Sequence, residues 1–96
     1  MNIDIKALQF TLKDEDREYL DRKLARIHNA ENMIVDIIFK IKKEKAFMAD
    51  AKVNFRWGVS IHVTEKDFEL TPAIDKLMDK LEAKINKEKE KVKEKH

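Results

Sequence analysis

Apolar and polar residues alternate in four segments of the chain, and two longer segments repeat their apolar residues every three or four positions. A period of two is typical of half-buried strands, and a period near 3.6 is typical of amphipathic helices. The first pattern predicts strands over residues 3–8, 35–42, 49–57 and 59–63. The second predicts helices over residues 14–28 and from residue 72 to beyond residue 87.

Several residues mark the expected ends of these elements. Asp14 opens an acidic run and is expected to cap the first helix, because acidic side chains are favoured at the positive end of the helix dipole. Thr71 is expected to cap the second helix, with Pro72 at its first helical position. Gly58, the only glycine, predicts a tight turn after the third strand, and residues 43–46 form the expected hairpin loop before that strand.

The order of elements is β-α-β-β-β-α, which predicts an α+β fold. Each helix has one apolar stripe and the sheet has one apolar face, so we expect a four-stranded sheet with both helices packed on one face. With 96 residues the chain is long enough for one small core. We therefore expect a single domain over residues 1–96, with a lysine- and glutamate-rich helical tail from about residue 87 to residue 96.

The composition excludes several classes of site. The chain has no cysteine, which excludes disulfides and thiolate chemistry. His28, His62 and His96 lack metal-ligand spacing, and Ser60 lacks the glycine-flanked turn that exposes a nucleophile. No apolar run approaches the length of a membrane span. We therefore expect a cytoplasmic protein that is not an enzyme, with no metal, no cofactor and no membrane partner.

Charge is abundant but nearly balanced. Charged residues make up 42% of the chain, while the formal net charge is only +2. Their arrangement on the second helix is more informative, because at about 100° per residue one arc of about 80° holds five lysines and another arc holds four acids. We name them the lysine row, Lys76, Lys80, Lys84, Lys87 and Lys91, and the acidic row, Asp75, Asp79, Glu82 and Glu90.

Like charges at this spacing reduce helix stability, by about 1 kcal/mol in total. A polyanionic partner would account for the lysine row, and lysine stems packed beside the apolar face are the alternative. Arg22, Lys23 and Arg26 form a second basic patch, and the two helices are expected to present both sets as one ridge. Such a ridge suits the backbone phosphates of folded RNA better than base reading. Phe55 and Trp57 are expected to pack in the core rather than to stack on bases.

Four segments of the chain resemble a known protein family. Residues 1–5 read MNIDI, residues 17–27 read REYLDRKLARI, residues 61–64 read IHVT, and residues 73–81 read AIDKLMDKL. In this order and at this spacing, they resemble the ribosome hibernation-promoting factor family, also called ribosome-associated inhibitor A or sigma-54 modulation protein. The last segment is the most specific, and a lysine-rich tail follows it as in the family.

The resemblance implies a domain that binds the small ribosomal subunit and its rRNA, occupies the mRNA and tRNA channel, blocks translation and stabilises idle ribosomes. A second factor that pairs ribosomes is a further candidate partner, and we expect a monomer off the ribosome. The family's rRNA-binding residues map to Lys23, Arg26, Lys80, Lys87, Lys89 and Lys91, to which helix geometry alone adds Arg22, Lys76 and Lys84.

The chain departs from the family pattern at three places. Ala83 stands where relatives often carry an arginine, residues 70–72 replace the usual lead into the last helix, and Arg56 and Trp57 replace a glycine-rich turn. The chain ends after the second helix, so it resembles the short form of the family.

Two other functions stay open. One is a generic double-stranded RNA-binding module, and the absence of a K-K-x-x-K motif in the second helix argues against it. The other is a protein-interaction regulator of the sigma-54 modulation type. Its expected contacts are Trp57, Phe68 and the edge of the 35–42 strand, and its binding would depend little on salt.

Overall fold

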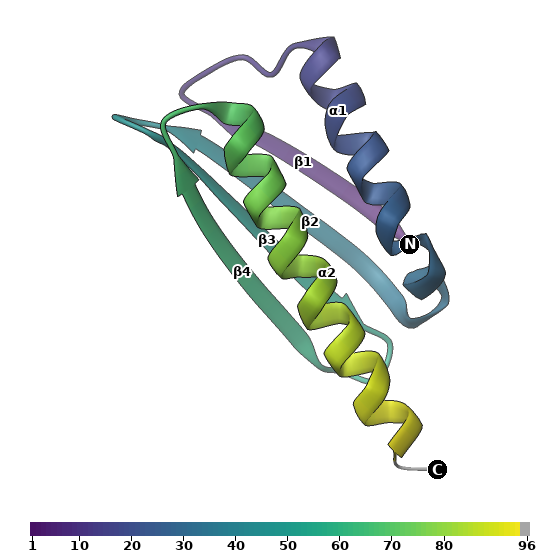
Figure 1. The fold of residues 1–96 in the computed structure, drawn as a ribbon. Helices are drawn as coiled ribbons and strands as arrows, with labels where there is room; N and C mark the ends of the chain where they lie inside the picture. The colour runs from purple at the N-terminus through teal and green to yellow at the C-terminus, as the bar shows by residue number, and fades with distance from the viewer. Residues whose placement is uncertain (95–96) are drawn as a thin grey trace.

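Two helices cover one face of a four-stranded sheet, as Figure 1 shows for this computed structural model. The structure describes residues 1–94, so residues 95–96 of the expected tail lie outside the described part. The elements are β1 (Asn2–Leu8), α1 (Asp14–Leu24), the 3₁₀ helix η1 (Ala25–Met33), β2 (Ile34–Lys43), β3 (Phe47–Phe55), β4 (Ser60–Asp67) and α2 (Leu70–Glu94).

The strands lie in the order β1-β2-β3-β4. β1 pairs parallel with β2 through the crossover formed by α1, and β2, β3 and β4 form an antiparallel meander. This topology confirms the predicted α+β class, the order of elements and the position of both helices on one face. β2 is an internal strand, so the predicted contact edge at residues 35–42 is wrong, and the edges of the sheet are β1 and β4.

The hydrophobic core lies between the sheet and the helices. Alternate residues of β2 and β3 are buried, and α2 lies over β3 and β4, where its buried apolar residues join the same core. The burial of one face of each element explains the period of two in the strands and the period near 3.6 in the helices. The largest fully buried side chains include Leu20, Ile27, Ile37, Phe39, Ile41, Ile74, Leu77, Met78, Leu81 and Ile85.

A bulge changes the start of β2. The pairing register with β3 shifts between Ile34 and Asp36, so that Val35 has no partner in the ladder. Ile34 is fully buried, whereas Val35 is 48% exposed. Strict alternation over the predicted strand 35–42 places Val35 on the apolar face with Ile37, and that prediction is wrong because one inserted residue moves its neighbours to the opposite face.

The first helix begins at Asp14, the first residue of the predicted range, but its cap and its end differ from the prediction. Lys13 is the capping residue, and the Asp16 carboxylate accepts a hydrogen bond from the Lys13 backbone N–H at 3.1 Å. The prediction of Asp14 as the cap is therefore wrong. The α-helix ends at Leu24, and the chain continues as η1, where an α-helix to residue 28 and a short turn were expected.

The second helix begins at Leu70, so Thr71 is not its cap. The Ala73 backbone N–H donates to the Glu69 carbonyl at 3.2 Å, which is the first bond of the helix. Pro72 therefore lies in the first turn, where the N–H that proline lacks has no intrahelical acceptor.

The turn between β3 and β4 contains Gly58, as predicted. Its φ of +84° is favourable only for glycine, and its N–H donates to the Phe55 carbonyl at 3.1 Å. Phe55 is buried as expected. The prediction for Trp57 is wrong, because β3 ends at Phe55 and the indole is 40% exposed in the turn.

Candidate nucleic-acid interface

The first part of the lysine row lies against the edge strand β4. Lys76 pairs with Asp67 at 2.8 Å, and Lys80 pairs with Glu65 at 2.5 Å. Lys76 also donates to a backbone carbonyl of β4 at 3.3 Å. These contacts across two elements offset the repulsion between like charges within the helix, so this part of the row has a structural role that the helical pattern alone does not reveal.

Three of the four residues of the acidic row face α1 and η1. Arg26 lies 3.0 Å from Asp79 and 2.5 Å from Glu82, and Lys23 lies 3.3 Å from Asp75. Asp75 also accepts a hydrogen bond from a tyrosine hydroxyl of α1. The hydrogen bond between Asp75 and Lys23 raises the pKa of Lys23. The hydrogen bond between Asp79 and Arg26 likewise raises the pKa of Arg26. The two helices are therefore joined by ion pairs along their seam.

This geometry corrects the expectation of one continuous basic ridge. Lys23 and Arg26 lie in the seam on one side of α2, and Lys76 and Lys80 lie beside β4 on the other side. The acidic row lies between the two basic sets. Arg22 is exposed on α1, where its guanidinium carbon lies 5.7 Å from the centre of a tyrosine ring.

The distal part of α2 extends past the end of the sheet (Figure 1). The second half of α2 carries the four lysines that remain of the predicted set, and Lys84 among them still lies against β4. Within the part of the chain that the structure describes, these four lysines form no ion pair. One of them, Lys84, donates a hydrogen bond to the His62 carbonyl at 3.3 Å. We name these residues the distal lysines, Lys84, Lys87, Lys89 and Lys91.

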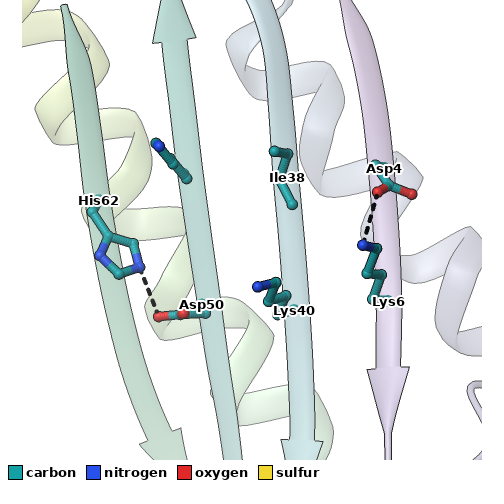
Figure 2. Close-up of a pocket in the computed structure, with 7 residues that line it drawn as sticks. Asp4, Lys6, Ile38, Lys40, Asp50 and His62 are labelled. Atoms are coloured by element: carbon teal, nitrogen blue, oxygen red, sulfur yellow. Dashed lines mark ion pairs between the residues drawn. The ribbon is translucent and has the colours of Figure 1, made fainter.

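The open face of the sheet holds a further group of lysines, which the helical pattern does not reveal (Figure 2). Lys6, Lys40 and Lys52 line a hollow that crosses the strands. Lys6 lies directly opposite Lys40 in the register of β1 and β2 and 4.0 Å from Asp4. The signal for this group is the polar half of the alternation, because every second strand residue must face away from the helices.

The ion pairs between α2 and β4 make stability depend on pH. Hydrogen bonds from Lys80 and Lys76 hold the pKa values of Glu65 and Asp67 below their ordinary values. Carboxyls with lowered folded pKa values stabilise the fold above their unfolded values of about 4, and this stabilisation is lost as pH falls through the folded values. The urea midpoint should therefore fall between neutral pH and about pH 3.

The control for this prediction is the variant Lys76→Met with Lys80→Met, which keeps the aliphatic stems and removes both cations. Its urea midpoint should be lower than that of the wild type at neutral pH and should change less on acidification. Equal falls in both proteins would contradict a role for these two pairs.

The seam between the helices gives a second prediction. One Glu82 carboxylate oxygen is buried, and Arg26 is the cation beside it. Arg26→Met should lower the free energy of unfolding, because it leaves that oxygen without its partner. Removing the carboxylate as well, in Arg26→Met with Glu82→Met, should recover part of the loss. Urea unfolding of Arg26→Met, Glu82→Met and the double variant measures the coupling between the two side chains. Strictly additive losses of stability would contradict this coupling.

Among the described residues, no group of three or more histidine, aspartate or glutamate side chains is arranged to hold a metal ion. No helix of this part is long and apolar enough to cross a membrane.

Comparison with known proteins agrees with the resemblance read from the sequence. Residues 3–93 match the family model described as sigma 54 modulation protein / S30EA ribosomal protein. A ribosomal subunit interface protein from Coxiella burnetii superposes with a TM-score of 0.84 at 26% identity, covering 93% of this chain and 98% of that one. The N-terminal domain of Thermus thermophilus Protein Y superposes with a TM-score of 0.78 at 26% identity, covering 91% and 98%.

No curated protein sequence matches the chain significantly. The family model nevertheless covers almost the whole sequence, and both solved structures share the order and packing of its elements over nearly their full length. The chain belongs to the sigma 54 modulation protein / S30EA ribosomal protein family.

Proposed function

We propose that this protein binds the small ribosomal subunit and silences translation by occupying the channel for mRNA and tRNA. The observation that carries the proposal is the set of four distal lysines on the second half of α2, which form no ion pair among the described residues. Family membership supports a ribosomal partner, as does the likeness to a protein described as a ribosomal subunit interface protein.

The chemistry of this surface favours contacts with phosphate groups. Lysine ammonium groups bind phosphates as point charges and carry no base specificity. Folded rRNA presents phosphates at fixed positions, and a rigid helix can place Lys84, Lys87 and Lys91 against them from one face. The protein would then act by steric exclusion, with no chemical step.

The proposal is tested by sedimentation of the protein with purified small ribosomal subunits in the presence and absence of mRNA and tRNA. We expect the protein to sediment with the subunit at low salt and to be displaced by mRNA and tRNA together. The logarithm of the affinity should fall with the logarithm of the salt concentration, with a slope of roughly −3 to −4 for four phosphate contacts.

Two outcomes would contradict the proposal. Simultaneous binding of the protein, mRNA and tRNA would exclude occupation of the channel. Binding that persists unchanged at high salt would exclude phosphate contacts as its main source, and it would favour the protein-interaction regulator instead. A cell-free translation assay at the same salt concentrations provides the functional readout, because silencing should follow occupancy of the subunit.

A further inference from the structure

Trp57 is an exposed aromatic side chain that is held in one position. Its ring stacks on Phe55 with centroids 5.2 Å apart and an angle of 21° between the ring planes. Its indole Nε1–H donates to a Glu88 carboxylate oxygen on α2 at 3.0 Å. The indole is nevertheless 40% exposed, while Phe55 beneath it is 2% exposed. The turn between β3 and β4 thus presents a fixed aromatic ring to solvent.

The contacts of Trp57 define what the ring is able to bind. Phe55 covers one face and Glu88 occupies the only polar hydrogen of the indole, so the accessible part is the opposite face and its rim. A ring without a free donor binds by stacking. Because the side chain is already ordered by two contacts, a ligand that stacks on it loses little further side-chain entropy.

The charges around Trp57 favour an anionic ligand. Glu88 lies on α2 one turn after Lys84 and three residues before Lys91, so the two lysines and Glu88 share one side of the helix. Arg56 precedes Trp57 in the turn and is exposed. An aromatic platform flanked by cations is the arrangement with which proteins bind single-stranded nucleic acid, where bases stack and phosphates meet the cations.

An apolar protein partner fits this site less well. Such a partner would have to desolvate the lysines and the arginine that surround the ring, which is costly without paired acids. Phe68, the most exposed large apolar residue at 81%, has neither a stacking nor a hydrogen-bonding contact in the described structure, so it lacks the positioning that Trp57 has. The observations therefore distinguish Trp57 from an ordinary exposed aromatic residue.

We propose that Trp57 is a stacking platform for one unpaired RNA base, next to the phosphates that the distal lysines bind. The proposal rests on the RNA-binding function proposed above and adds a contact to it. Since stacking is tolerant of sequence, the site would accept purines and pyrimidines, and it would extend the interface from the helix to the turn between β3 and β4.

Fluorescence provides a direct test, because Trp57 is the only tryptophan of the chain. Titration with a short single-stranded oligoadenylate should quench its emission, and a duplex of the same length should quench it much less. Binding to small ribosomal subunits should weaken roughly tenfold in Trp57→Leu and should be largely kept in Trp57→Phe, which retains an aromatic face.

The salt dependence separates stacking from charge. Loss of a stacked base should lower the affinity of Trp57→Leu at every salt concentration and leave the slope of log affinity against log salt unchanged. Phe68→Leu, which shortens an exposed aromatic residue elsewhere, is the matched control and should bind as the wild type does. Circular dichroism of each variant shows that it is folded.

The outcomes distinguish this proposal from the function on which it rests. Subunit binding that is equal in wild type and Trp57→Leu would overturn the stacking platform and leave the proposed function intact. Quenching by the oligonucleotide without any binding to the subunit would support the platform and overturn the ribosomal function. Loss of binding in Trp57→Leu together with a changed salt slope would also overturn the platform, because it would indicate a displaced α2.

Discussion

Replacing Lys84, Lys87 and Lys91 together by glutamate should weaken binding to small ribosomal subunits at least about a hundredfold at low salt. Each lost contact between an exposed lysine and a phosphate is worth about 1 kcal/mol, and three of them correspond to about two powers of ten. The slope of log affinity against log salt should become shallower by about 3, because fewer counterions are released on binding. Sedimentation over a series of salt concentrations measures both quantities.

A matched control removes the same charge from a different face. Lys40, Lys52 and Lys66 lie on strand residues that alternate with the buried ones, and their side chains face away from the helices. Their triple replacement by glutamate changes the net charge by the same amount and should reduce binding much less. An equal loss in both triple variants would contradict a specific role for the distal lysines, since net charge alone would then account for the affinity.

The strands show how far alternation alone predicts this fold. A period of two identified all four strands, because alternate strand residues face the helices and are less exposed than their neighbours over most of the sheet. It failed at Val35 and Trp57, where a bulge and an early strand end change which residues meet the core. Both features depend on the pairing partner of the strand, which a local pattern does not contain.

The candidate site shows a similar division. Helical periodicity placed the lysine row and the acidic row correctly on separate arcs of α2. It did not reveal that Glu65 and Asp67 of β4 neutralise part of the first row, or that Arg26 of η1 neutralises part of the second. These contacts join residues far apart in the sequence, so only tertiary packing brings them together. The distal lysines became distinguishable only once these partners were known.

Phe39→Ala should have the largest effect on stability, a loss of about 3–5 kcal/mol in the free energy of unfolding. Phe39 is fully buried on the internal strand β2, where it faces the helices. Its partners in the neighbouring strands are Ile5 of β1 and Ala51 of β3. Urea unfolding followed by circular dichroism measures the change, and Met48→Ala on the exposed face of β3 is the control, with an expected effect within about 0.5 kcal/mol.

The expected loss of stability in Phe39→Ala lies in the upper part of the range of about 3–5 kcal/mol, because the neighbouring residues cannot fill the cavity that the substitution leaves. Ala51 is buried directly opposite Phe39, and Ala49 is buried two residues away on the same face. Alanine has no rotamer that would fill the space, and the backbone of an internal strand is held by hydrogen bonds on both sides. A loss below about 1.5 kcal/mol would contradict this account and would indicate that α1 or α2 moves into the cavity. Since the free energy of unfolding of a small domain is about 5–15 kcal/mol, Phe39→Ala should remain only marginally folded. The molecules that remain folded should bind small ribosomal subunits with the wild-type slope of log affinity against log salt.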